Sequence, residues 1–98
     1  MLDFYTNQTI PWRKKTGVRD NGAPLFAPAS DIRGRFEYSR RLIIDAKGER
    51  VVSEARAYTK APVAPGDTLT WDGREWIILA VRTEYGLSGV EMHREARL

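Results

Sequence analysis

The side chains that could perform acid–base or nucleophilic chemistry are few in this chain of 98 residues. His93 is the single histidine, and it alternates with Glu91 and Glu95 in a pattern typical of a solvated strand face rather than of a general base. The chain has no cysteine, which excludes thiolate catalysis, disulfides and cysteine-rich zinc sites. No serine stands in a nucleophile-elbow motif. We therefore expect a protein that is not an enzyme, with no catalytic residue, no cofactor and no metal.

Four carboxylates flank predicted turns, where acidic side chains favour hydrogen bonds to nearby backbone amides. They are Asp67, Asp72, Glu75 and Glu84. We interpret these residues as parts of the turns rather than as acid–base groups.

Basic side chains gather in the first part of the chain. Residues 1–41 hold eight Lys and Arg against four Asp and Glu, whereas residues 42–98 hold eight against nine. The excess could face phosphates or an acidic protein surface, or serve solubility alone.

Residues 33–41 interleave arginine with aromatic residues, a pattern that small barrels use to bind nucleic acid. Phe36 and Tyr38 share a predicted strand face with Ile32, however, so we interpret both aromatics as core residues. A small OB- or SH3-like barrel that binds nucleic acid without sequence specificity is therefore the alternative function.

Short strands in the last third of the chain must position His93 and the four carboxylates. Asp72-Gly73 predicts a hairpin with a type I′ turn, which needs positive φ at both central residues. Residues 75–81 are apolar on both faces, which predicts a strand covered on both sides. A second turn at residues 85–89 leads into residues 90–98, a strand with one solvated face.

The earlier part of the chain shows further strand patterns. We predict strands at residues 2–10, ended by Pro11, at residues 32–45, interrupted at Arg40-Arg41, and at residues 50–59. The turn between the last two should place Gly48 in the left-handed conformation. Small residues on one face of the third strand predict the close approach of another element: Ser53, Ala55 and Ala57.

Residues 11–31 hold three of the five prolines and show no apolar period, which predicts a long loop that could be mobile. Its apolar and basic side chains suit a partner. The partner-interface residues that we predict are Trp12, Arg13, Lys14, Lys15, Leu25 and Phe26. The alternative for Leu25 and Phe26 is that they cap the core of the protein itself.

About six or seven strands and no helix predict an all-β fold, a small antiparallel β-barrel formed by one domain over residues 1–98. A barrel suits a small all-β chain because closure removes exposed sheet edges. No apolar run is long enough for a membrane span and no signal peptide is visible, so we expect synthesis in the cytoplasm and no membrane partner.

Several turn and strand motifs also occur in a recognisable order. They are Asp45 to Glu49 with Gly48, Pro65-Gly66-Asp67, Asp72-Gly73-Arg74-Glu75-Trp76, and His93-Arg94-Glu95 near the end. In this order and spacing the chain resembles the head-closure proteins of tailed bacteriophages. That family is also described as stoppers, head-tail joining proteins or minor capsid proteins, including those of prophages.

The resemblance implies a structural protein of the virion neck. Such a subunit, which could be monomeric when free, would assemble in a homo-oligomeric ring under the portal and its adaptor and close the DNA-filled head. A tail-completion or tail-terminator protein would attach to the ring. Contacts around the ring would be heterologous. On this hypothesis residues 12–26 dock onto the adaptor or the next subunit through Trp12 and Phe26, and Arg13, Lys14 and Lys15 face the packaged DNA.

Overall fold

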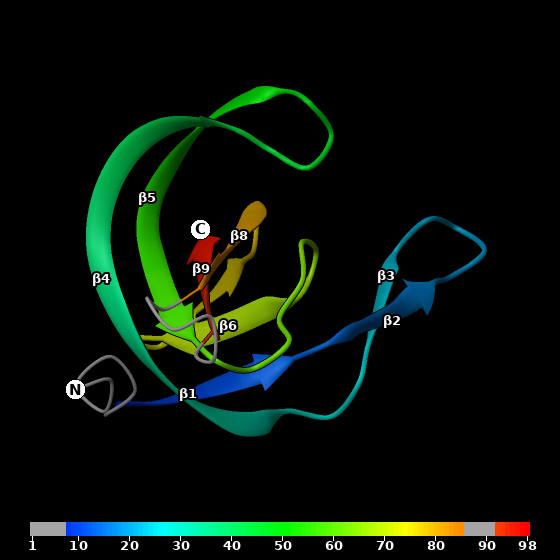
Figure 1. Cartoon of the computed structure of the whole chain (residues 1–98). Coiled ribbons are helices and arrows are strands. Elements are labelled where there is room, and N and C mark those ends of the chain that lie inside the picture. The colour runs from blue at the N-terminus through cyan, green and yellow to red at the C-terminus, as the bar shows by residue number, and fades with distance from the viewer. Residues whose placement is uncertain (1–7, 86–91) are drawn as a thin grey trace.

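The computed structural model describes residues 8–85 and 92–98, which form nine strands and no helix (Figure 1). The strands are β1 (Gln8–Arg13), β2 (Lys15–Val18), β3 (Pro24–Phe26), β4 (Ser30–Ile44), β5 (Arg50–Thr59), β6 (Thr68–Trp71), β7 (Arg74–Ile77), β8 (Ala80–Tyr85) and β9 (Met92–Arg97). The predicted all-β class is thereby confirmed. The predicted residues 2–7 of the first strand and 86–91 around the second turn lie outside the described residues.

Seven strands form one antiparallel sheet in the order β7-β6-β1-β4-β5-β9-β8, while β2 and β3 form a separate pair. The long strands β4 and β5 bend round the other strands and give the sheet its barrel-like curl (Figure 1). The prediction of a small antiparallel β fold is confirmed.

The two outer strands of the sheet, β7 and β8, are consecutive in the chain. Among the described residues no ladder joins them, so the barrel is not closed by hydrogen bonds between its outer strands. The chain itself makes the connection, because the Ile78 amide donates to the Asp67 carbonyl at 2.9 Å and the Leu79 amide to the Arg97 carbonyl at 2.8 Å. Residue 78 is thus hydrogen-bonded just before β6, and residue 79 is hydrogen-bonded to the end of β9.

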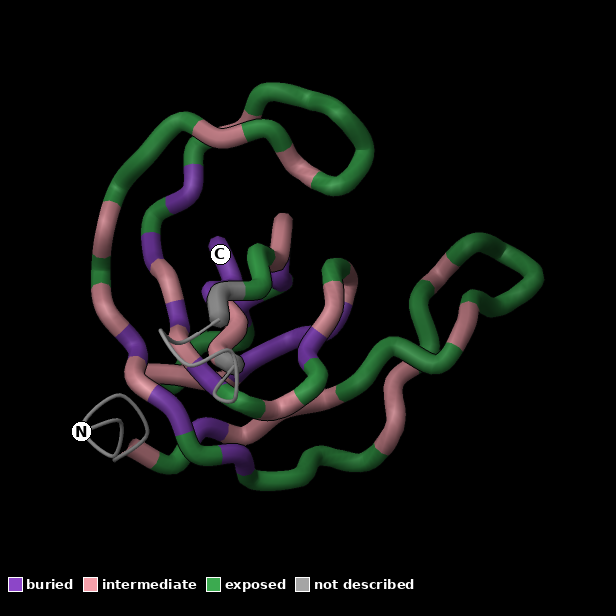
Figure 2. The backbone as a smooth tube through the Cα atoms, viewed as in Figure 1, coloured by how far each residue is buried: buried purple, intermediate pink, exposed green. Residues whose placement is uncertain are grey.

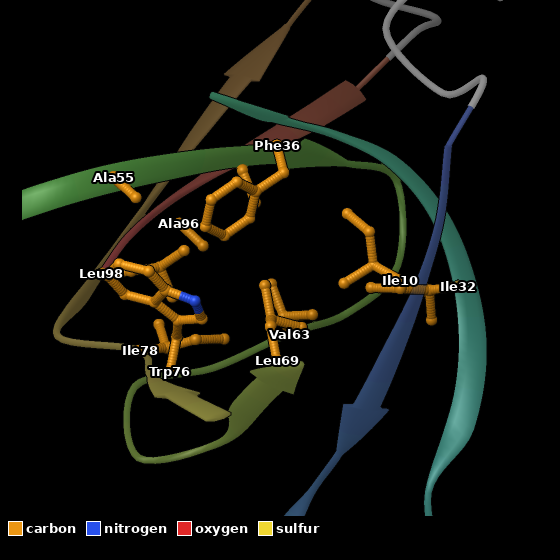
Figure 3. Close-up of a cluster of buried hydrophobic side chains, with 11 residues drawn as sticks. Ile10, Ile32, Phe36, Ala55, Val63, Leu69, Trp76, Ile78, Ala96 and Leu98 are labelled. Atoms are coloured by element: carbon orange, nitrogen blue, oxygen red, sulfur yellow. The ribbon is translucent and has the colours of Figure 1, made fainter. Parts of the chain in front are cut away.

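The core lies on the inner face of this curl, where side chains from both halves of the chain meet (Figure 3). Phe36 is buried against two indoles, with its ring stacked 5.3 Å from Trp71 and tilted 5.5 Å from Trp76. Offset and tilted ring pairs stabilise a core beyond the area they bury. The other buried apolar residues are Ile10, Ile32, Ala55, Ala57, Val63, Leu69, Ile78, Ala96 and Leu98.

The predicted turns at Asp72-Gly73 and at Gly48 are confirmed. Asp72 and Gly73 have φ of 53° and 70°, as a type I′ turn requires, and Gly48 has φ of 84°. Ser53 on β5 is buried with Ala55 and Ala57, and its hydroxyl donates to the Leu98 carbonyl at 3.0 Å. Leu98, which follows β9, thus continues the pairing of that strand alongside β5.

The prediction of a long loop at residues 11–31 is wrong. β1 continues through Pro11. β6 pairs with β1 only from Trp12 onward, so Pro11 lies at a sheet edge on that side. A proline is tolerated there because its missing amide hydrogen is not needed for pairing. β2 and β3 then form a hairpin whose register shifts after Lys15, and such a short, bulged pairing shows no apolar period in the sequence.

Two predicted faces are also wrong. Ile77 on β7 is 60% exposed, so this strand is not covered on both sides. Tyr38 is 61% exposed rather than part of the core, because the β4–β5 register shifts between Tyr38 and Arg41, where the outer half of the hairpin begins.

The predicted solvated face of the last strand is in fact buried, since Glu95 is 8% and Arg97 6% exposed. β9 lies between β5 and β8 in the sheet. The Arg97 guanidinium crosses β5 and donates to the Ser39 carbonyl at 3.0 Å, while Arg56 pairs with Glu95 at 3.8 Å. Alternation alone could not show that neighbouring strands would cover these charges.

Candidate functional site

A two-stranded arm projects from the curled sheet (Figure 1). We define the arm as residues 14–28, which contain β2, β3 and their connection. The Arg19 amide donates to the Ala23 carbonyl at 2.7 Å, and Gly22 has φ of 87°, which suits glycine. The arm is exposed along most of its length (Figure 2), including the apolar Val18 and Leu25.

The buried carboxylate of Asp67 fixes the base of the arm to the barrel. It accepts hydrogen bonds from Trp12 Nε1 at 3.0 Å, from the Lys15 amide at 2.9 Å and from the Ala64 amide at 3.0 Å. Asp67 is only 2% exposed, so these three donors replace the water that a carboxylate otherwise needs. The arm therefore leaves the barrel in a defined direction.

The predicted interface residues divide between the barrel and the solvent. Trp12 is half-buried and packs against the core. Arg13 contacts Glu75 at 3.4 Å and lies over the ring of the half-buried Phe26 at 5.0 Å. Lys14 and Lys15 are exposed, as is Leu25. Arg13 thus contacts Phe26, and Trp12 packs toward the core. The spacing of these residues in the sequence could not predict either contact.

A second exposed apolar surface lies on the outer half of the β4–β5 hairpin, residues 41–53, which we call the arch. Its tip bends back, and the Ala46 amide donates to the Leu79 carbonyl at 3.1 Å. Leu42 and Val52 stand opposite each other in the arch and are both exposed. Together with two other exposed residues they make the arch surface: Leu42, Ile44, Val52 and Ile77.

This surface was not predicted from the sequence, although the run Leu42-Ile43-Ile44 carried a usable signal. Three consecutive large apolar residues place side chains on both faces of a strand. One face of a hairpin that leaves the barrel must then remain exposed. Which face is exposed depends on how far the sheet curls, and this cannot be predicted from the sequence.

Two hollows flank the contact between the arch and Leu79. The larger, of about 380 Å³, is bounded by the arm base at Lys15 and Phe26, by the arch tip at residues 45–47, and by residues 77–79. The smaller, of about 260 Å³, has Val52, Ile77 and Leu79 in its lining. The arch surface is therefore uneven, with recesses of mixed apolar and charged lining beside exposed apolar side chains.

Charged side chains on the outer face of β4, β5 and β9 pair with one another. Arg56 contacts Glu37 at 2.9 Å and Glu95 at 3.8 Å, and Glu37 also contacts Arg35 at 2.7 Å. Burial lowers the pKa of Arg97, although the neighbouring Glu95 opposes that shift. These contacts join three arginines, Arg35, Arg56 and Arg97, to two glutamates, so the group keeps a net charge of +1.

Residues 8–85 and 92–98 contain no group of three or more histidine, aspartate and glutamate side chains that could hold a metal ion. In the same part of the chain no helix is long and apolar enough to cross a membrane. No protein-family model matches this sequence, and no curated protein matches it.

Proposed function

We propose that this protein is a structural subunit of the neck of a tailed-phage virion. It would form a ring under the portal and its adaptor, close the DNA-filled head and offer the surface to which the tail attaches. The order of turn and strand motifs in the sequence supports this function. The single observation that carries it is the arm, an exposed apolar and basic projection anchored to a compact β domain.

The chemistry of the arm suits docking onto another protein. Val18 and Leu25 expose apolar area that a partner would remove from water, at about 25 cal/mol per Å². The Asp67 hydrogen bonds hold the base in place, so docking orders fewer groups than docking of a free loop would. The adaptor or an adjacent subunit is the proposed partner.

The basic residues at the arm base have separate roles in this proposal. Lys14 and Lys15 are exposed and are the residues that we propose to face packaged DNA. Arg13 is engaged by Glu75, and we assign it to the support of the arm rather than to DNA.

The test is assembly with purified portal–adaptor rings from a tailed phage, followed by sedimentation and electron microscopy. The wild-type protein should add a ring to the connector. Replacing Val18 and Leu25 with serine should weaken this association about tenfold or more, since buried apolar anchors dominate interface energy. Thr16→Ser, also on the exposed arm, is the matched control and should bind as the wild type does.

Two results would overturn the proposal. One is a folded protein that ignores every connector offered. The other is binding to oligonucleotides with an affinity that falls steeply with salt, which would favour the nucleic-acid-binding barrel.

A further inference from the structure

We propose that copies of this chain join head to tail, with the arm of one copy lying on the arch surface of the next. The inference rests on the proposed ring and names its two contacting faces. Six of the seven exposed large hydrophobic residues that the structure describes belong to these faces. They are Val18 and Leu25 on the arm and the four residues of the arch surface.

The two faces are complementary in shape. The arm is a narrow two-stranded projection (Figure 1). The arch surface has a hollow of about 260 Å³ beside it, which Val52 and Ile77 line together. The hollow of about 380 Å³ is walled on one side by the arm of the same chain, at Lys15, Pro24 and Phe26. A projecting apolar hairpin can fill the smaller recess, whereas two projecting arms cannot fill each other.

The arm does not cover the arch surface of its own chain. Its base is fixed by hydrogen bonds from Trp12 and the Lys15 amide to Asp67, and Val18 and the arch surface both remain exposed in the same molecule. Both faces are therefore free to contact another molecule. Because the two faces differ, the contact is heterologous and propagates into a ring or a filament.

Charge favours the arm-to-arch pairing over an arm-to-arm pairing. Residues 14–28 hold three Lys and Arg against one Asp, a net charge of +2. Residues 41–53 of the arch and residues 74–77 together hold four basic and three acidic residues, a net charge of +1. Two arms would therefore repel each other more strongly than an arm and the arch would.

The chain has no cysteine, so single cysteines can trap this contact without background. We would mix Val18→Cys protein with isotope-labelled Ile77→Cys protein, add a short bismaleimide, and measure mixed dimers by mass spectrometry. Lys60→Cys, at an exposed site after the end of β5 that is remote from the arch, replaces Ile77→Cys in the control mixture. We expect about tenfold more mixed dimer than in the control, equivalent to about 1.4 kcal/mol of preference. Equal yields in the two mixtures would overturn the inference.

A second pair of variants tests the head-to-tail geometry. Val18→Asp removes the arm face and Ile77→Asp removes the arch face. Each variant alone should fail to associate, because every junction lacks one face. Their mixture keeps one intact junction and should stop at dimers in sedimentation. A mixture that stays monomeric while the wild type associates would overturn the inference, as would association of either variant alone. Urea unfolding checks that both variants fold.

Connector binding, measured in parallel, separates this inference from the proposed function. Mixed dimers without any binding to portal–adaptor rings would support the arm-to-arch contact and remove the neck role. Binding to the rings with no preferred cross-link would support the neck role and remove the contact.

Discussion

Asp67 shows how one side chain can organise a projection 52 residues away in sequence. Position beside a turn predicts a local bond, and the Ala64 amide indeed donates to this carboxylate at 3.0 Å. The bonds from Trp12 and the Lys15 amide were not predictable, because they depend on β1 lying beside β6. The sequence thus predicted the hydrogen bond of Asp67 to a nearby backbone amide but not its hydrogen bonds to the base of the arm.

We predict that Asp67→Asn lowers the free energy of unfolding by about 1–3 kcal/mol, because in either orientation the amide nitrogen replaces a carboxylate oxygen that accepts at least one hydrogen bond. Trp12 Nε1 and the Ala64 amide bind Oδ2, and the Lys15 amide binds Oδ1. Urea unfolding followed by tryptophan fluorescence measures the change. Asp20→Asn, at the exposed arm turn, is the control and should stay within about 0.5 kcal/mol of the wild type. Equal losses in the two variants would show that Asp67 is not an anchor.

At the scale of elements, alternation and turn chemistry located most of the strands. β4 and β5 follow the predicted boundaries closely, and the predicted interruption at Arg40-Arg41 appears as a register shift within one continuous strand. Short elements were missed, since β2 and β3 offer only a few paired residues. The burial of β9 charges was missed because it depends on the neighbouring strands.

Close approach between β4 and β5 makes Gly34 a sensitive position. A β-carbon added there would lie 2.5 Å from the Tyr58 carbonyl oxygen, too close for either strand to keep its place. We expect Gly34→Ala to destabilise the protein by about 1–3 kcal/mol through overpacking. Gly17→Ala in the arm is the matched control, because nothing lies within 4 Å of its added β-carbon. Thermal unfolding of both proteins tests the difference, and equal midpoints would contradict it.

At the scale of the whole molecule, the barrel-like body and the arm are separate structural units. The core residues lie outside residues 14–28, and the contacts that hold the arm base come from Asp67 and Glu75. The sequence predicted the class of fold and the neighbourhood of the interface. It could not predict that the arm and the arch would stand apart as two faces, since that follows from the curl of β4 and β5.

We predict that replacing residues 17–25 by a short Gly-Ser linker leaves the stability of the body within about 0.5 kcal/mol, because surface changes away from the core cost little. β1 and β4 keep their direct pairing, which runs from Gln8 with Gly34 to Trp12 with Ser30. Urea unfolding should therefore give the same midpoint and slope as the wild type. A large drop in midpoint would mean that the arm is part of the folding unit.

The direct pairing of β1 with β4 on either side of the arm has a consequence for chain continuity. A protease that cuts after Arg19, in the exposed arm turn, would divide the molecule between two strands that remain hydrogen-bonded to each other. The halves need no peptide bond to stay together, and the first strand could be supplied as a separate peptide. The arm is therefore the place where this fold can be split, or receive an inserted sequence, with its body intact.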